Sequence, residues 1–243
     1  MAPSVGQCEE LIEPAEGAGR VLLVGHEFRL STQWGRMRRL IAEGAIGAVQ
    51  ACAIDLWRRP YRPGSGNWRW DQARVFSWVL EEPVHFFDLA CWWMREAGSP
   101  EWVYARGSRL PSTPDGLWDN LTAVLEFETG AHATVTQSLT AAEHHVAARV
   151  MGDRGALIAA WDGEMDRTTE PRASLKLFDG ERLGEIAIEA SGEWFELRAE
   201  LAHFARVCAG EEAPVITPAE AARAVAICEA AERSIRSGEA ERV

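Results

Sequence analysis

Residues 77–89 carry the side chains of this sequence that are best suited to proton transfer. Two adjacent acids, a histidine and a third acid lie close together there, namely Glu81, Glu82, His85 and Asp88. Histidine moves protons readily near neutral pH, and a neighbouring carboxylate would orient the imidazole and stabilise its charged form. On a continuous helix, positions 81, 85 and 88 share one face. The pattern therefore predicts an acid–base site around His85.

An alternative for His85 remains open, in which it is a core histidine whose hydrogen bonds Asp88 satisfies. Pro83 lies between Glu81 and His85. A proline inside a helix removes a hydrogen bond and clashes with the preceding turn. The helix is therefore either kinked at Pro83 or begins anew at Glu82 and Pro83, and in both cases Glu81 is rotated relative to His85.

Two further polar segments are candidates for substrate binding. His26 and Arg29 directly follow an apolar run at residues 21–24, and ligands in open α/β sheets bind at the carboxyl ends of strands. Arg58 and Trp68 flank the loop at residues 60–66, where an arginine could bind hydroxyls or a carboxylate. The alternatives are a simple surface loop around Arg29 and arginines that stack on surface tryptophans.

Strands and helices alternate in blocks along the chain. Helical spacing of apolar residues predicts helices at residues 7–18, 31–43 and 74–94, a helix whose apolar stripe is Leu197, Leu201, Phe204 and Cys208, and a last helix from Thr217 to Gly238. Strands are predicted at residues 49–57, 102–109, 121–127, 131–139, 145–151, 156–161, 174–178 and 183–188.

Short turns between successive strands, such as Thr129-Gly130 and Asp179-Gly180, imply antiparallel pairing. The predicted fold class is therefore α+β, with a large, mainly antiparallel sheet and helices on one face. The other face of this sheet needs cover, and a second copy of the chain is the natural candidate. We therefore expect a homo-oligomer that associates through the open sheet face.

Composition excludes several classes of protein. The net charge of −12 over 243 residues repels phosphate backbones, so nucleic acid is not expected as a partner. No apolar run approaches the ~20 residues of a membrane helix, and the first residues do not resemble a signal peptide, so no membrane association and a cytoplasmic location are expected. The five cysteines are irregularly spaced, without C-x-x-C, and suggest neither a metal site nor disulfides.

The order of several motifs resembles the C-terminal part of the Gfo/Idh/MocA oxidoreductases. The motifs are residues 24–29 after an apolar run, residues 41–49, His85-Phe86-Phe87-Asp88-Leu89, residues 126–131, residues 151–157 and a helix that ends at residues 234–238. The resemblance implies a sugar, cyclitol or related hydroxyl compound as substrate and NAD or NADP as cofactor. It also implies that His85 is the catalytic proton donor and acceptor, with Glu81 where the family usually has an aspartate. It places His26, Arg29, Arg58, Trp68 and Asp88 in regions that border the substrate pocket.

The sequence departs from the family in the segments that would bind the dinucleotide. No glycine-rich turn lies between a strand and a helix, as pyrophosphate binding requires, and the family's Glu-Lys-Pro motif is absent. We therefore predict no cofactor-binding residue in this chain. Residues 1–29 are expected to be a short remnant of a Rossmann domain, its last helix and a buried strand at residues 21–24, and residues 30–243 to form the substrate-binding and oligomerisation domain.

Three functions are compatible with the sequence. The first is an NAD(P)-dependent oxidoreductase lineage in which this chain carries the substrate-binding and catalytic half. The second is a module without catalytic activity that binds a ligand or a partner subunit. The third is a lyase or glycosidase of the same family, in which NAD is used only transiently.

Overall fold

The centre of the molecule is a nine-stranded sheet with the strand order β8-β7-β6-β5-β1-β4-β3-β2-β9. The computed structural model describes all residues from 1 to 243. Every neighbouring pair of strands is antiparallel except β1 and β4. The strands are β1 (Val49–Trp57), β2 (Pro100–Ser108), β3 (Asn120–Phe127), β4 (His132–Ser138), β5 (His144–Gly152), β6 (Ala156–Gly163), β7 (Arg172–Phe178), β8 (Leu183–Glu185) and β9 (Glu241–Arg242). The predicted fold class and eight of these strands are confirmed, whereas β9 has no apolar alternation that would reveal it.

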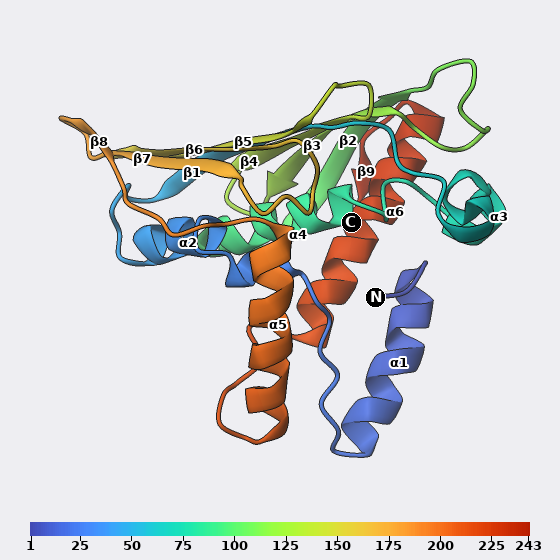
Figure 1. Cartoon of the computed structure of the whole chain (residues 1–243), viewed down its shortest axis with the longest axis horizontal. Coiled ribbons are helices and arrows are strands. Elements are labelled where there is room, and N and C mark those ends of the chain that lie inside the picture. Colours follow the sequence, from blue (N-terminus) through green and yellow to red (C-terminus); the bar gives the residue numbers. More distant parts are fainter.

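The helices cover one face of the sheet and leave the other bare (Figure 1). Helices α2 (Trp34–Ala42), α4 (Pro83–Trp93) and α6 (Pro218–Ser237) lie against the covered face. Alternate residues of each strand point to the two faces, so Cys52 and Ile54 of β1 are buried while their neighbours Ala51 and Ala53 are half-buried. The bare face carries exposed apolar side chains, including Tyr104, Val124 and Ile158.

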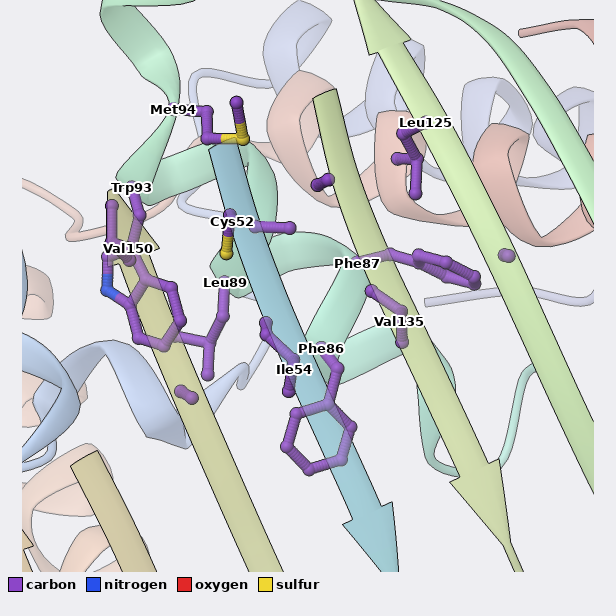
Figure 2. Packing of buried hydrophobic residues seen from close by; sticks show 14 of the residues in the cluster. Cys52, Ile54, Phe86, Phe87, Leu89, Trp93, Met94, Leu125, Val135 and Val150 are labelled. Carbon is purple, nitrogen blue, oxygen red and sulfur yellow. The ribbon is translucent and has the colours of Figure 1, made fainter. Parts of the chain in front are cut away.

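Helix α4 begins at Pro83, so this segment is not one helix kinked at the proline but contains a new helix that begins there. A short helix, α3 (Gln72–Val75), precedes it, and Glu82 is the N-cap residue of α4. Proline fits the first helical position because its missing N–H would have no partner there. Figure 2 shows Phe86, Phe87, Leu89 and Trp93 of α4 packed among Cys52, Ile54, Val135 and Val150 of the sheet. This packing fixes the rotation of α4 and hence the direction of His85.

Helix α6 begins and ends as the sequence predicts. The hydroxyl of Thr217 accepts a hydrogen bond from the backbone N–H of Glu220, whose carboxylate in turn accepts from the N–H of Thr217. Gly238 ends the helix in the left-handed conformation, with φ of 80°. The N-cap residue of α2 is Gln33, and the hydroxyl of Ser31 stabilises the turn before this helix by accepting hydrogen bonds from the N–H groups of Gln33 and Trp34.

Two predictions about the elements are wrong. Residues 21–24 form no strand, because no other strand lies beside them to complete the hydrogen bonds; α1 (Val5–Gly17) before them is helical as predicted. In α5 (Glu193–Cys208) the predicted buried stripe is largely exposed, with Leu201 71% and Phe204 41% accessible. Figure 1 shows the reason, since α1 and α5 project away from the sheet. No helix of the chain combines the length and apolar character that a membrane crossing requires.

Candidate active site

A cavity of about 310 Å³ opens at the N-terminal end of α4. Its walls come from the 3-10 helix η1 (Glu27–Leu30), the loop after β1, the beginnings of α4, β5 and α5, and the turn after β6. Aromatic side chains form part of the wall, among them Phe28, Trp34, Tyr61 and Trp161. A cavity of this size accepts a ligand of about one sugar ring, since small-molecule sites start at roughly 300 Å³.

His85 lines this cavity from the first turn of α4. Its neighbours Phe86 and Phe87 face the sheet, which turns the imidazole away from the core, and 27% of the side chain is exposed. The imidazole contacts the rings of His26 and Phe28, with centroids 5.1 and 5.5 Å away. Its Nδ1 atom has no hydrogen-bond partner. The structure therefore places a partly exposed imidazole at a ligand-sized hollow, with its Nδ1 atom buried on the side of Glu27, which does not agree with the core-histidine alternative.

The carboxylate nearest to His85 is Glu27, not Glu81. Oε2 of Glu27 lies 3.6 Å from Nδ1 of His85. Because α4 begins only at Pro83, Glu81 does not share its helical face, and its carboxylate forms an ion pair with Arg69 instead. Glu81 nevertheless lines the same cavity. Sequence reasoning missed Glu27, although it stands between His26 and Arg29, two residues that were singled out.

Arg29 and Asp88 face each other and not the cavity. Nε and Nη2 of Arg29 donate hydrogen bonds of 2.8 and 2.7 Å to the two oxygens of Asp88, and both side chains are only 2% exposed. Arg29 also donates to the carbonyl of Val215 and to Glu220. Burial raises the pKa of Asp88, and the Arg29 pair opposes that rise. The predicted substrate-binding role is therefore not supported for these two residues, because they tie η1 to α4 and α6 behind the site.

His26 and Trp68 support the cavity wall from outside it. His26 is 4% exposed, and burial followed by the nearby His85 keeps its pKa well below the usual value, so its ring is neutral. It is held in the left-handed region with φ of 41°. Trp68 lies in a second small apolar cluster, and its ring carries the guanidinium of Arg69 at 4.7 Å. Neither residue is among those that line the cavity.

Arg58 is the centre of a charged network on the wall formed by the loop after β1. It pairs with Glu82 and, at 3.2 Å, with Asp166, and its guanidinium stacks on Tyr61. Burial raises the pKa of Glu82 to about 6, against the lowering effect of Arg58. Nε2 of His144 lies 3.7 Å from Glu82, and burial lowers the pKa of His144 to about 3. His144 is therefore a neutral side chain of the cavity wall.

The inner wall near the start of α5 adds carboxylates that the sequence did not indicate. Glu196 is 2% exposed, and its Oε1 accepts hydrogen bonds from the hydroxyl of Ser191 and the N–H of Gly192. Burial raises its pKa to about 7. Glu193 pairs with Arg167 at 2.8 Å. Both acids line the cavity because α5 turns this face inward rather than the apolar stripe expected from its sequence.

The chain offers no cradle for a dinucleotide pyrophosphate. Two helices begin at the cavity. The cap residue of α4 is the acidic Glu82, and the first turn of α5 carries Glu193 and Glu196, so both N-termini would repel a phosphate. Eight acids but five arginines line the cavity, and three of these arginines already bind carboxylates. The residues present therefore do not fit the phosphates of NAD or NADP, and we assign no residue of this chain to that group.

The fold, a large sheet with helices on one face, is shared with proteins of known structure. An aldose-aldose oxidoreductase from Caulobacter crescentus, solved with glycerol, superposes with a TM-score of 0.81 at 20% identity, over 100% of this chain and 70% of that one. GenD2 from gentamicin A biosynthesis, solved with NAD, gives a TM-score of 0.77 at 19% identity, over 100% and 69% of the two chains.

Sequence comparison defines the family. The GFO/IDH/MocA C-terminal domain matches residues 34–158. The chain therefore belongs to the GFO/IDH/MocA oxidoreductase family. It is also 30% identical over 124 residues to YteT of Bacillus subtilis (strain 168), which is described as an oxidoreductase. That match covers 50% of this chain and 28% of YteT, so the chain spans little more than a quarter of this relative.

Proposed function

We propose that this chain carries the substrate-binding and acid–base half of an oxidoreductase for a sugar, cyclitol or related hydroxyl compound. The observation that supports this most directly is His85, whose partly exposed imidazole lines the cavity beside the carboxylate of Glu27. Oxidation of a secondary alcohol requires a base that takes the hydroxyl proton as the adjacent carbon loses hydride. The imidazole of His85 is the group of this cavity that is suited to that step.

Glu27 is proposed to stabilise His85 after proton transfer. A carboxylate at 3.6 Å favours the imidazolium that forms when His85 accepts the proton. Glu27 is 8% exposed and has no arginine partner, so its charge is directed at the histidine with little screening by solvent. Glu81 is proposed as a substrate-contacting residue together with Arg58 and Arg69, because all three line the cavity.

The cofactor proposed for this chemistry is NAD or NADP, which would accept the hydride. GenD2, which has the same fold, was solved with NAD, and this supports the choice of cofactor class. Because the residues of this chain do not fit the phosphates, the dinucleotide would have to be bound by a nucleotide-binding domain that these residues do not form. The exposed stripe of α5 with Leu201 and Phe204 is proposed as the surface on which such a domain packs.

The test separates ligand binding from catalysis. The chain is titrated by calorimetry with a panel of aldoses and inositols, and each mixture is then assayed for reduction of NAD and NADP. We expect binding of at least one polyol, and, where turnover is observed, His85→Ala should lower the rate by roughly 10²–10⁴-fold. His132→Ala, at an exposed position on β4, is the matched control and should change neither quantity. Unchanged turnover in His85→Ala would contradict the proposed role.

A ligand-binding module without catalysis is the second candidate. The observation in its favour is that the cavity is well formed whereas no pyrophosphate cradle exists in this chain. This candidate predicts polyol binding without any change in NADH fluorescence on mixing with the chain. Enhanced NADH fluorescence together with polyol-dependent turnover would exclude it.

A further inference from the structure

Two segments of the chain frame the mouth of the cavity. The lining residues that are exposed to solvent come from the loop after β1 and from the connection between β6 and β7, and they are Arg59, Pro60, Arg62, Glu164 and Arg167. Residues that line a cavity and are also exposed lie at its rim. A ligand therefore passes between the loop after β1 and the β6–β7 connection, residues 164–171, on its way to His85.

The β6–β7 connection has no backbone hydrogen bond to any other element. The single backbone bond within it runs from the N–H of Thr168 to the carbonyl of Met165. None of its side chains is buried. Its polar contacts to the rest of the chain come from the side chains of Met165, Asp166 and Arg167, whose partners are Arg62, Arg58 and Glu193. Segments with few buried contacts and few backbone hydrogen bonds are those that open most readily in a native fold.

Two ion pairs attach this connection to separate walls of the cavity. Oδ2 of Asp166 lies 3.2 Å from Nη2 of Arg58, at the start of the loop after β1. Nε of Arg167 donates a hydrogen bond of 2.8 Å to Oε1 of Glu193, in the first turn of α5. The side chains of Asp166 and Arg167 are 39% and 64% exposed. Ion pairs that reach solvent contribute little to stability, so both pairs can open at little cost.

The wall side of these pairs is held independently of the connection. Arg58 also pairs with Glu82 and stacks on the ring of Tyr61, and both of these partners line the cavity. Glu193 belongs to the sixteen-residue helix α5, written in the structure as 16 residues. Opening of the two ion pairs would therefore release residues 164–171 and leave the other walls of the cavity in place.

We propose that residues 164–171 form a lid over the cavity, with Asp166 and Arg167 as its latches, and that the closed lid limits the bound ligand to a single ring. The proposal deepens the proposed function and rests on it, because the lid would enclose the polyol beside His85. The volume of about 310 Å³ is at the lower end of small-molecule sites, so a second ring would have to extend through the mouth. Closure of such a segment excludes water from the reacting groups.

The first experiment measures access to position 85 without a ligand. His85→Cys places a thiol where the partly exposed imidazole lines the cavity, and peptide mapping by mass spectrometry follows its alkylation. Small iodoacetamide and bulky fluorescein-5-maleimide are compared. The double variant Asp166→Asn, Arg167→Gln removes both latches without changing the net charge. It should accelerate labelling by the bulky reagent at least about fivefold and labelling by iodoacetamide less than about twofold.

The second experiment varies the number of rings in the ligand. Affinities for D-glucose, D-galactose and myo-inositol are measured by calorimetry and compared with those for cellobiose, lactose and galactinol, each of which contains one of these rings. We expect the unmodified chain to bind at least one single-ring compound about tenfold more tightly than its two-ring counterpart. In the double latch variant this difference should fall to about threefold or less.

Matched variants show whether the effect belongs to the latches. Glu170→Gln combined with Arg172→Gln also leaves the net charge unchanged, at exposed positions that do not line the cavity, and should alter neither labelling nor ring preference. Arg167→Lys keeps the positive charge opposite Glu193 and should resemble the unmodified chain. Circular dichroism melts check that all variants fold.

The outcomes separate the lid from the proposed function. If the double latch variant labelled at the unmodified rate with the bulky reagent, or if two-ring compounds bound as tightly as single-ring ones, the lid would be overturned and the polyol site would stand. Binding of no compound, together with faster bulky labelling in the latch variant, would overturn the polyol site and the ring limit but not the opening segment. A thiol at position 85 that reacts with neither reagent in any variant would overturn both.

Discussion

Arg29 and Asp88 are side chains of types that often bind substrates, but in this structure they bind each other. Their two-pronged contact is buried between η1, α4 and α6 and holds Phe28, on the cavity side of η1, against His85. Removing one partner of a buried ion pair leaves an uncompensated charge, which costs far more than an exposed pair contributes.

Asp88→Asn should therefore lower the free energy of unfolding by about 3 kcal/mol, since Glu220 at 3.2 Å compensates Arg29 in part. Urea unfolding followed by tryptophan fluorescence measures this. The double variant Arg29→Met, Asp88→Leu is the control and should recover much of the loss. If Asp88→Asn folded normally but bound polyols weakly, Asp88 would belong to the substrate site after all.

Glu196 should make the stability of the chain depend on pH. Its pKa is raised from the ordinary 4.5 to about 7 in the folded state, so between these values the folded chain binds more protons than the unfolded chain. Stability is then highest below pH 4.5 as far as this group is concerned, and it falls as the pH rises toward 7. The loss is about 3 kcal/mol at most. Glu196→Gln should flatten the decrease between pH 5 and pH 8 in urea unfolding. An unchanged slope would show that Glu196 is not buried as a neutral acid.

For single residues, the sequence indicates which side chains belong to the site better than it indicates which side chains they contact. His85 and Arg58 do line the cavity, as predicted. Glu81 was chosen as the partner of His85 from helical spacing, but the helix begins only two residues later, at Pro83. Glu27 and His144 come from distant segments, and no spacing rule within one sequence brings them to His85.

Among the elements, α5 is the helix whose buried face cannot be predicted from the sequence. Its apolar residues Leu197, Leu201 and Phe204 recur at helical spacing, which normally indicates the buried face. In the structure the buried residues are Glu196, His203 and Val207. The usual pattern is reversed in α5, because Glu196 is buried at the cavity wall and the apolar stripe faces outward. Periodicity alone therefore predicts the wrong face of this helix as buried.

Substitutions on the two faces of α5 should differ in their effect on stability. Leu201→Ser should change the melting temperature of this chain very little, because 71% of Leu201 is already exposed. Val207→Ser, at a 5% exposed position, should lower stability by about 1–3 kcal/mol through lost burial and an added polar group. Circular dichroism melts of the two variants compare them directly. A large effect of Leu201→Ser would mean that α5 is rotated relative to the structure.

The strands and the other helices were predictable because their patterns agree with their packing. Alternation in β1 to β7 matches one covered and one bare face, and the capping residues of α6 mark its beginning and end. The prediction of a strand at residues 21–24 was wrong for a physical reason. An apolar run forms a strand only where another strand supplies its hydrogen-bond partners.

For the whole molecule, the bare sheet face is the feature that points to self-association. Tyr104, Val124 and Ile158 are exposed on it at 38–40%. We propose that this face pairs with a second copy of the chain, because exposed apolar side chains on an uncovered sheet face gain from association. The double variant Val124→Lys, Ile158→Lys should shift sedimentation toward the monomer without lowering the melting temperature. A wild-type chain that sediments as a monomer at micromolar concentration would contradict the proposal.

The placement of β1 has a consequence for how the chain folds. Residues 49–57 sit between two strands that occur some 80 residues later, β4 and β5, and the segment joining those strands must pass the end of β1. There the N–H of Arg58 donates to Ser138 and the N–H of Ala141 donates to the carbonyl of Arg58. The central strand β1 can therefore pair only with strands that follow much later in the sequence. Such long-range pairing raises the contact order, and a high contact order favours slow folding. During synthesis on the ribosome, the cavity cannot take shape until residues beyond 152 have emerged.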